Sequence, residues 1–175
     1  MDSVQAWATL MVGLVALVIS VAAFVQARRV AKRESYVVAR EILSDLTKGE
    51  VARARDVIGT LRYGTEKGWS ALDYSDVINQ YYILEWALER ASYGLKGLRP
   101  AGHKVQASMI TAITWHIREL TTSLAMLHSA FPRSMVDDDT WEVLESVLQL
   151  VKVEKPTPSE TDVATIRLRL ESLRG

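Results

Sequence analysis

The sequence contains no cysteine, and only nine glycines and four prolines in 175 residues. The absence of cysteine excludes disulfides, cysteine-based zinc sites, thiolate nucleophiles and lipid attachment to cysteine, and it fits a reducing compartment. The scarcity of glycine and proline leaves long intervals without a helix breaker. Sustained alternation of apolar and polar residues, which marks strands, is also lacking. These absences together predict an all-α chain.

Charge of one sign is not in excess either. The chain has 21 basic and 21 acidic side chains, for a formal net charge of zero. Bulk attraction to nucleic acid is therefore not expected, and we predict no nucleic-acid partner. Hydrophobic residues make up 49% of the chain, which is too apolar for a disordered protein. The length allows one domain and an anchor.

Charged residues are absent from Ser3 to Ala27. An α-helix from Val4 to Val25 would be roughly 33 Å long, which matches the ~30 Å hydrocarbon core of a bilayer. Trp7 lies near one end, where an amphipathic ring favours the membrane interface. A cleaved signal peptide is the alternative, but it requires basic residues before a shorter apolar run. We therefore predict a transmembrane anchor over residues 1–27.

A basic cluster follows the apolar run and consists of Arg28, Arg29, Lys32 and Arg33. Basic residues beside a membrane span tend to stay in the cytoplasm. The cluster therefore predicts a single-pass protein of the inner (cytoplasmic) membrane, with its N-terminus outside and residues 28–175 in the cytoplasm. The same cations are expected to contact anionic lipid headgroups.

Small residues recur along the anchor at spacings of three and four. This small-residue seam consists of Ala6, Thr9, Gly13, Ala16, Ser20, Ala23 and Ala27. Small side chains let two membrane helices approach closely, and a 3.5-residue period favours left-handed packing. One interpretation is that the anchor self-associates or docks on another membrane helix. The other is that the pattern arises by chance, because alanine and glycine are common in membrane spans.

The residues that follow the anchor divide into three further parts. No glycine or proline occurs between Gly13 and Gly49, so the anchor helix is expected to continue as a basic juxtamembrane helix over 28–48. Gly49 would end it in the left-handed conformation. A hinge near Glu34–Ser35 is the alternative. A helical bundle over 49–153 and a proline-linked C-terminal helix over 154–175 complete the predicted organisation.

Apolar side chains recur at helical spacing in five segments, which lie near residues 50–63, 73–97, 104–130, 139–153 and 159–173. Short links between them predict a cytosolic bundle of about five helices. Residues 64–70 are expected to form a loop. Asp139 is expected to cap the fourth segment together with Glu142. Pro156 and Pro158 are expected to set the last helix apart from the rest.

No residue pattern points strongly to catalysis or to metal binding. The three histidines are His103, His116 and His128, and only His116 has a possible second ligand one turn away, in Glu119. We therefore predict no enzyme activity, no cofactor, no metal and no small-molecule ligand. The alternative is a membrane-bound enzyme that uses Glu85, Glu89 and His116 inside the bundle.

Aromatic residues are concentrated in the segment 73–97. They either fill the core or form a patch for a protein partner, because tyrosine and tryptophan bury a large area and keep a polar tip. The candidate patch consists of Asn79, Tyr82, Glu85 and Trp86.

The run Val77-Ile78-Asn79-Gln80-Tyr81-Tyr82-Ile83-Leu84-Glu85-Trp86, followed by Gly94-Leu95, resembles a family of uncharacterised bacterial single-pass membrane proteins. In that family an asparagine, an aromatic pair and a glutamate precede a glycine that ends the helix. The resemblance covers about residues 35–150. It implies an N-terminal span, a basic juxtamembrane helix and a helical domain, and it implies no activity.

These observations favour a membrane-anchored interaction or regulatory module that forms a homo-oligomer or binds another membrane protein. A membrane-bound enzyme and a structural accessory subunit of a larger membrane complex are the alternatives.

Overall fold

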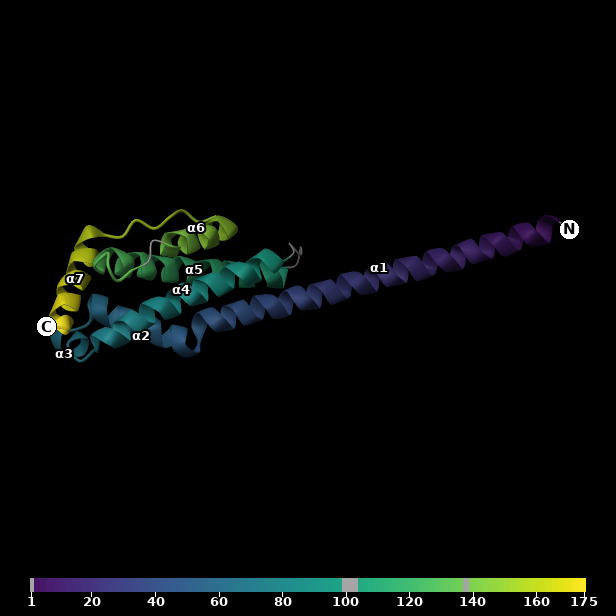
Figure 1. Ribbon diagram of the computed structural model, residues 1–175. Helices are drawn as coiled ribbons and strands as arrows, with labels where there is room; N and C mark the ends of the chain where they lie inside the picture. The colour runs from purple at the N-terminus through teal and green to yellow at the C-terminus, as the bar shows by residue number, and fades with distance from the viewer. Residues whose placement is uncertain (1, 99–103, 137–138) are drawn as a thin grey trace. The chain divides into compact units, whose positions relative to one another are not determined.

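The computed structural model describes residues 2–98, 104–136 and 139–175, and their side chains apart from those of 2–6, 8–10 and 104–106. All regular secondary structure in these ranges is helical, so the all-α prediction is confirmed (Figure 1). The helices are α1 (Asp2–Thr47), α2 (Gly49–Tyr63), α3 (Glu66–Trp69), α4 (Tyr74–Gly97), α5 (Lys104–Ala130), α6 (Asp139–Val151) and α7 (Glu160–Arg174). The chain divides into two compact units, Met1–Val37 and Val38–Gly175.

The first unit is the N-terminal part of α1. It contains a helix that is long and apolar enough to cross a membrane, judged by length and composition. Every residue from 11 to 30 is exposed, and those from 11 to 27 carry no charge. The helical backbone continues through Glu34–Ser35, where the alternative placed a hinge. It ends beside Gly49, whose φ of +59° is the left-handed conformation that glycine adopts without strain.

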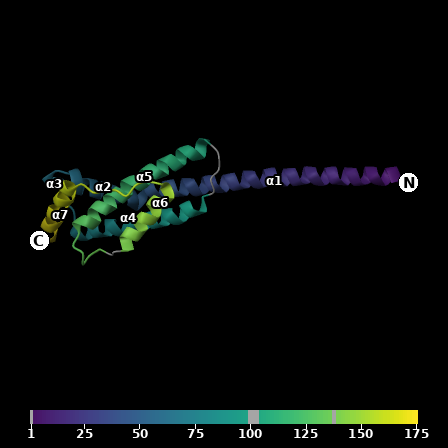
Figure 2. The same cartoon turned by 90° about the horizontal axis from the view of Figure 1, so that it is seen from above.

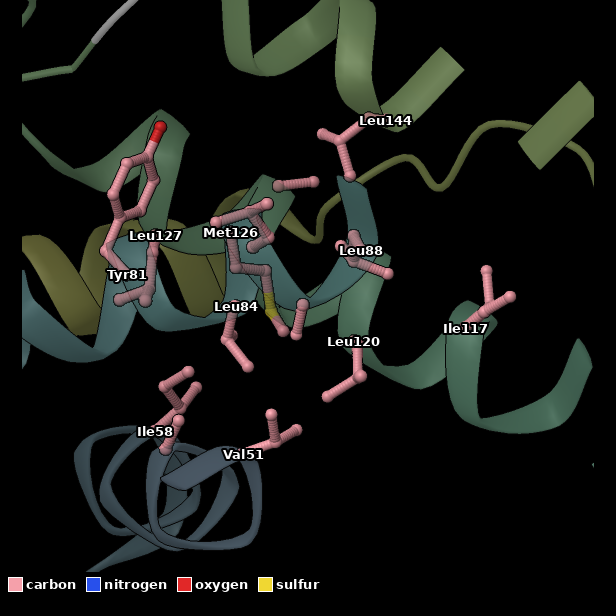
Figure 3. Packing of buried hydrophobic residues seen from close by; sticks show 14 of the residues in the cluster. Val51, Ile58, Tyr81, Leu84, Leu88, Ile117, Leu120, Met126, Leu127 and Leu144 are labelled. Atoms are coloured by element: carbon pink, nitrogen blue, oxygen red, sulfur yellow. The ribbon is translucent and has the colours of Figure 1, made fainter. Parts of the chain in front are cut away.

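The second unit is a helical bundle around one apolar core. Helix α4 packs against α2, α5, α6 and α7, and α5 also contacts α6 and α7. Figure 2 shows the same helices from above. Tyr81, Leu84 and Leu88 of α4 meet Leu120 and other apolar side chains of α5 in the interior (Figure 3). Burial of these side chains supplies the main driving force for folding.

The segment 64–70, expected to be a loop, contains the one-turn helix α3. The amides of Gly68 and Trp69 both donate to the carbonyl of Thr65, at 2.9 and 3.1 Å. The guanidinium of Arg169 in α7 lies 5.5 Å from the centre of the Trp69 ring. The turn α3 is therefore accompanied by a contact with α7, which is distant in the sequence. The residues of the segment 64–70 alone do not predict this contact.

Helix α7 is a packed part of the bundle, although two prolines precede it. Ile166 and Leu170 are buried in the core. Arg167 donates to the Ser129 carbonyl of α5 at 2.8 Å, and Arg169 donates to the Leu61 carbonyl of α2 at 2.7 Å. The last carbonyls of a helix have no partner within it, so α7 satisfies the C-terminal turns of two other helices. The prolines therefore do not set this helix apart.

Candidate functional site

One side of α4 carries large aromatic side chains that point to solvent. Tyr82, Trp86 and Tyr93 are 47%, 55% and 64% exposed. Asn79 is also exposed, and the spacings of three, four and seven residues place all four on one side of the helix. We call these four residues the α4 aromatic face. Tyr81, by contrast, is 1% exposed.

Cations hold two rings of the α4 aromatic face. The Arg90 guanidinium lies 5.4 Å from the centre of the Trp86 ring and forms an ion pair of 3.2 Å with Asp45. The Lys96 ammonium lies 5.3 Å from the centre of the Tyr93 ring. Cation–π contacts of this kind contribute roughly 0.5–1 kcal/mol at exposed positions. They orient the rings without covering them.

A groove of about 250 Å³ borders Trp86 within the second unit. Its walls come from the end of α1, the start of α2 and the middle of α4, and include Lys48, Ile83 and Arg90. Asp45 and Glu50 line it as well, so the groove combines an exposed tryptophan with side chains of both charges. Such a surface suits a segment whose apolar groups are bordered by polar ones.

Glu85 does not lie on the α4 aromatic face with the other three residues of the predicted patch. Its carboxylate accepts a hydrogen bond of 2.6 Å from the hydroxyl of Thr140 in α6. Glu85 therefore faces a neighbouring helix, whereas Asn79, Tyr82 and Trp86 face solvent.

Glu85 is one end of a chain of hydrogen bonds that joins three helices. We call Glu85, Thr140, Tyr81 and His128 the polar chain. The Tyr81 Oη lies 2.7 Å from Thr140 Oγ1 and 3.0 Å from His128 Nδ1. Thr140 and Tyr81 are buried, and the His128 ring stacks on Tyr81 and meets Trp141 edge to face. The polar chain thus ties α4 to both α5 and α6.

The carboxylate fixes the direction of every proton in the polar chain. Thr140 gives its one hydroxyl proton to Glu85, so its oxygen accepts from Tyr81. Tyr81 has then used its own proton, and its oxygen accepts from a protonated Nδ1 of His128. Bonds aligned in this way polarise one another. No single local pattern marks these four residues, which come from three separate helices.

His116 contacts a different helix from the one that Glu85 contacts. Arg55 of α2 donates to His116 Nδ1 at 3.2 Å. Partial burial, and then the Arg55 charge, hold the pKa of His116 below its usual value, against an opposing effect of Glu119. Glu85 bonds to Thr140 of α6 instead.

Groups of three His, Asp or Glu side chains placed to hold a metal ion do not occur in the part of the chain that the structure describes. His103, Asp137 and Asp138 lie outside the described residues. Helix α6 includes Asp139 as its first residue, and the position before it lies outside the described residues, so the capping role expected of Asp139 stays a prediction.

The small-residue seam is exposed along the apolar helix at Gly13, Ala16, Ser20, Ala23 and Ala27, whereas the side chains of Ala6 and Thr9 lie outside the described ones. The Ser20 hydroxyl donates to the carbonyl of Ala16 at 2.8 Å, so it is satisfied within the helix. An internally satisfied hydroxyl is compatible with a lipid environment.

The basic cluster Arg28, Arg29, Lys32 and Arg33 is exposed, and none of its members takes part in the salt bridges found among the described residues. The Arg28 guanidinium lies 5.1 Å from the centre of the Phe24 ring. An arginine over an aromatic ring at the end of an apolar run is typical of a membrane interface.

Comparisons with protein-family models, with curated proteins and with solved structures gave no match. The resemblance drawn from the segment 77–86 stays a prediction.

Proposed function

We propose that this protein is a membrane-anchored interaction or regulatory module. Helix α1 spans the cytoplasmic membrane with the N-terminus outside, and the bundle binds a cytoplasmic protein through the α4 aromatic face. One observation carries the proposal: three large aromatic side chains are exposed on one side of α4, whereas other side chains of the same helix fill the core of the bundle. Tyrosine and tryptophan are enriched where proteins bind one another.

The surroundings of the α4 aromatic face favour a partner segment with apolar and acidic side chains. Lys48 and Lys96 border the face, and neither forms a salt bridge with another described residue. An acidic partner would pair with them at the rim, while its apolar groups cover Trp86 and Tyr82. Rim charges of this kind mainly raise the association rate and the specificity.

The first unit supports the membrane part of the proposal. Every residue from 11 to 27 is exposed and uncharged, and in water this helix would present a very large uncovered apolar surface. The exposed basic cluster follows it directly, and each cation near an anionic bilayer contributes about 1 kcal/mol.

The binding surface is tested by site-specific photo-crosslinking in cells. A benzoylphenylalanine replaces Trp86 or Tyr82 in the full chain, and Tyr63, which is 71% exposed on α2, serves as the matched control. We expect a discrete adduct from positions 82 and 86 and none from 63. The same adduct should weaken when Lys96→Glu is added, because acidic groups on the partner would then be repelled. Equal adducts at all three positions, or none, would contradict the proposal.

The orientation is tested with single cysteines, because the natural chain has none. A membrane-impermeant maleimide should label Ser3→Cys in intact spheroplasts, and it should label Ser70→Cys only after the membrane is opened. The reverse labelling would refute the orientation, and labelling of both in intact spheroplasts would refute the membrane span.

A further inference from the structure

Helix α6 is followed by a lysine in a conformation that glycine normally adopts. Lys152 has a φ of +56°, and it is the one residue other than glycine with a positive φ in the part of the chain that the structure describes. Its amide donates to the Gln149 carbonyl at 3.3 Å, and the amide of Val153 donates to the Leu148 carbonyl at 3.1 Å. This pair of bonds is the Schellman motif, whose left-handed position usually holds glycine because a Cβ is strained there. The motif itself therefore gives no reason for a lysine.

The helix dipole does not explain this position either. A cation near the C-terminus of a helix is stabilised by the dipole, but any exposed position in the last turn provides that effect without strain. The last turn of α6 contains no basic residue. Strained residues of this kind are concentrated at sites that bind or react, so the surroundings of the Lys152 side chain are of interest.

Lys152 lines a polar pocket of about 560 Å³ together with Arg118 of α5 and Lys155 of the segment that follows α6. Lys155 is already paired, because its ammonium lies 2.7 Å from the Glu145 carboxylate and 4.4 Å from the centre of the Trp141 ring. Arg118 and Lys152 are exposed, and neither takes part in the salt bridges found among the described residues. The pocket therefore offers two cations to a ligand.

The segment that forms one wall of the pocket is held in place at several points. Val153 packs against the core, and Lys155 is bound to α6 through Glu145. Pro156, which also lines the pocket, has a φ fixed by its ring. A preformed wall lowers the entropy that is lost when a ligand binds.

The polar groups of the pocket determine which ligand fits. The fork of an arginine matches two oxygens of a phosphate, and a lysine adds a point charge. Glu154 also lines the pocket, and its carboxylate can only accept hydrogen bonds. The Thr122 hydroxyl donates to the Arg118 carbonyl at 2.8 Å, so its oxygen is left as an acceptor. A molecule that carries a phosphate and also hydroxyl donors satisfies all four groups.

We propose that this pocket binds a small soluble phosphate monoester that carries free hydroxyl groups. Arg118 and Lys152 bind the phosphate, and Glu154 and Thr122 accept from the hydroxyls. The two cations come from segments far apart in the chain, so no local pattern marks the site, and the proposal revises the prediction of no small-molecule ligand. It adds a ligand to the interaction or regulatory module proposed above.

The phosphate site is tested by titration calorimetry of the full chain in a non-ionic detergent, with glycerol 3-phosphate as the probe. We expect saturable binding of one molecule per chain, and no binding of glycerol. Lys152→Gly and Arg118→Gln should each weaken the affinity by about tenfold. Lys67→Gln, which removes an exposed cation of α3, is the control and should leave the affinity unchanged.

Lys152→Gly also separates binding from folding. Glycine removes the backbone strain, so this variant should have a higher Tm without the probe and yet bind it less tightly. An affinity equal to that of the natural chain would show that Lys152 does not bind the probe, and it would overturn the proposal. The absence of any saturable binding to the natural chain would overturn it as well.

The hydroxyl part of the proposal is tested with inorganic phosphate. The natural chain should bind glycerol 3-phosphate more tightly than inorganic phosphate, and Glu154→Ala should reduce that preference to within about twofold, because Glu154 accepts from the hydroxyls and repels a bare anion. An unchanged preference in Glu154→Ala would refute this role of Glu154.

A lipid source of the phosphate is tested with dioctanoyl phosphatidic acid in the micelles. Both glycerol hydroxyls of that lipid are esterified, so it should not compete with glycerol 3-phosphate. Competition would assign the pocket to a lipid headgroup and overturn the soluble ligand. None of the residues that line the pocket belongs to α4, so failure here leaves the photo-crosslinking result at Trp86 unaffected, and the reverse also holds.

Discussion

Replacement of Thr140 by valine tests the polar chain directly. Valine has nearly the shape of threonine, so the change removes a hydroxyl and opens no cavity in the buried site of Thr140. Two hydrogen bonds are lost, the one to Glu85 at 2.6 Å and the one from Tyr81 at 2.7 Å. A hydrogen bond to a charged group contributes about 1.5–3 kcal/mol, and a buried donor without an acceptor costs about 1–3 kcal/mol.

Two features of the site moderate that cost. Glu85 is half-buried and can recover a bond to water. Tyr81 can turn its hydroxyl proton toward His128 Nδ1, 3.0 Å away, provided that this nitrogen gives up its own proton. We therefore expect a loss of about 2 kcal/mol in the free energy of unfolding. A chain of this length would show a fall in Tm of roughly 4–8 °C.

The assay has two readouts on the full chain in detergent micelles. Thermal unfolding gives the stability, and the ¹⁵N chemical shifts of the imidazoles give the protonated nitrogen, with His128 assigned by comparison with His128→Gln. His128 should carry a proton on Nδ1 in the natural chain and lose it in Thr140→Val. Thr111→Val is the control, because the exposed Thr111 donates to the carbonyl of Ala107 in its own helix. A loss below about 0.5 kcal/mol, or an Nδ1 that stays protonated in the variant, would refute the reasoning.

Three further changes have expected outcomes. Lys152→Gly should stabilise the bundle by about 0.5–1 kcal/mol in thermal unfolding, because Lys152 is held at a φ of +56°, where a side chain is strained; an unchanged Tm would contradict this. Arg169→Met should cost about 1 kcal/mol by leaving the Leu61 carbonyl without its donor, whereas the exposed Arg174→Met should have little effect. His116→Gln should flatten the decline of stability below pH 6.5. A histidine whose pKa is lower in the folded chain binds its proton first in the unfolded chain, so its contribution is present above pH 6.5 and is lost as the pH falls; an unaltered pH profile would exclude His116 as the cause.

Signals close to several of the described helix ends allowed much of the fold to be predicted from the sequence. Gly49 has the left-handed conformation that its position suggested. Helix α4 begins where Asp73 accepts from the Ser75 amide at 2.8 Å, a bond that also lowers the pKa of Asp73. Helix α5 ends at Ala130, two residues before Pro132. Local residue types determine such ends, and a single sequence displays them.

The contacts that the sequence did not reveal all join distant segments. Helix α7 is attached through arginine bonds to the carbonyls of Ser129 and Leu61, and any exposed arginine looks the same in a sequence. The carbonyls that accept these bonds belong to the backbone, so residue type does not mark them. The proline pair before α7 therefore suggested that this helix is separate from the bundle, whereas its tertiary contacts show that it is packed against α2 and α5.

The candidate patch shows the same limit at the scale of one helix turn. Residues 82, 85 and 86 share a side of an ideal helix, so helical spacing grouped Glu85 with Tyr82 and Trp86. The position of α6 divides that side, because Thr140 approaches Glu85 and leaves the other two in solvent. Tyr81 and Tyr82 are adjacent and chemically identical, yet one is buried and the other exposed. Only the helices packed around α4 distinguish them.

The polar chain explains how α4 is held at one rotation about its axis. Apolar burial of Leu84 and Leu88 stabilises the bundle without a strong directional preference, so it tolerates small rotations of the helix. Hydrogen bonds weaken steeply when they are misaligned. Bonds from Tyr81 and Glu85, one turn apart on α4, to the single hydroxyl of Thr140 therefore resist rotation in both directions. The same constraint determines which side of α4 faces solvent, and that side carries Tyr82, Trp86 and Tyr93. In this protein a buried polar network and an exposed aromatic surface are two consequences of how one helix is oriented.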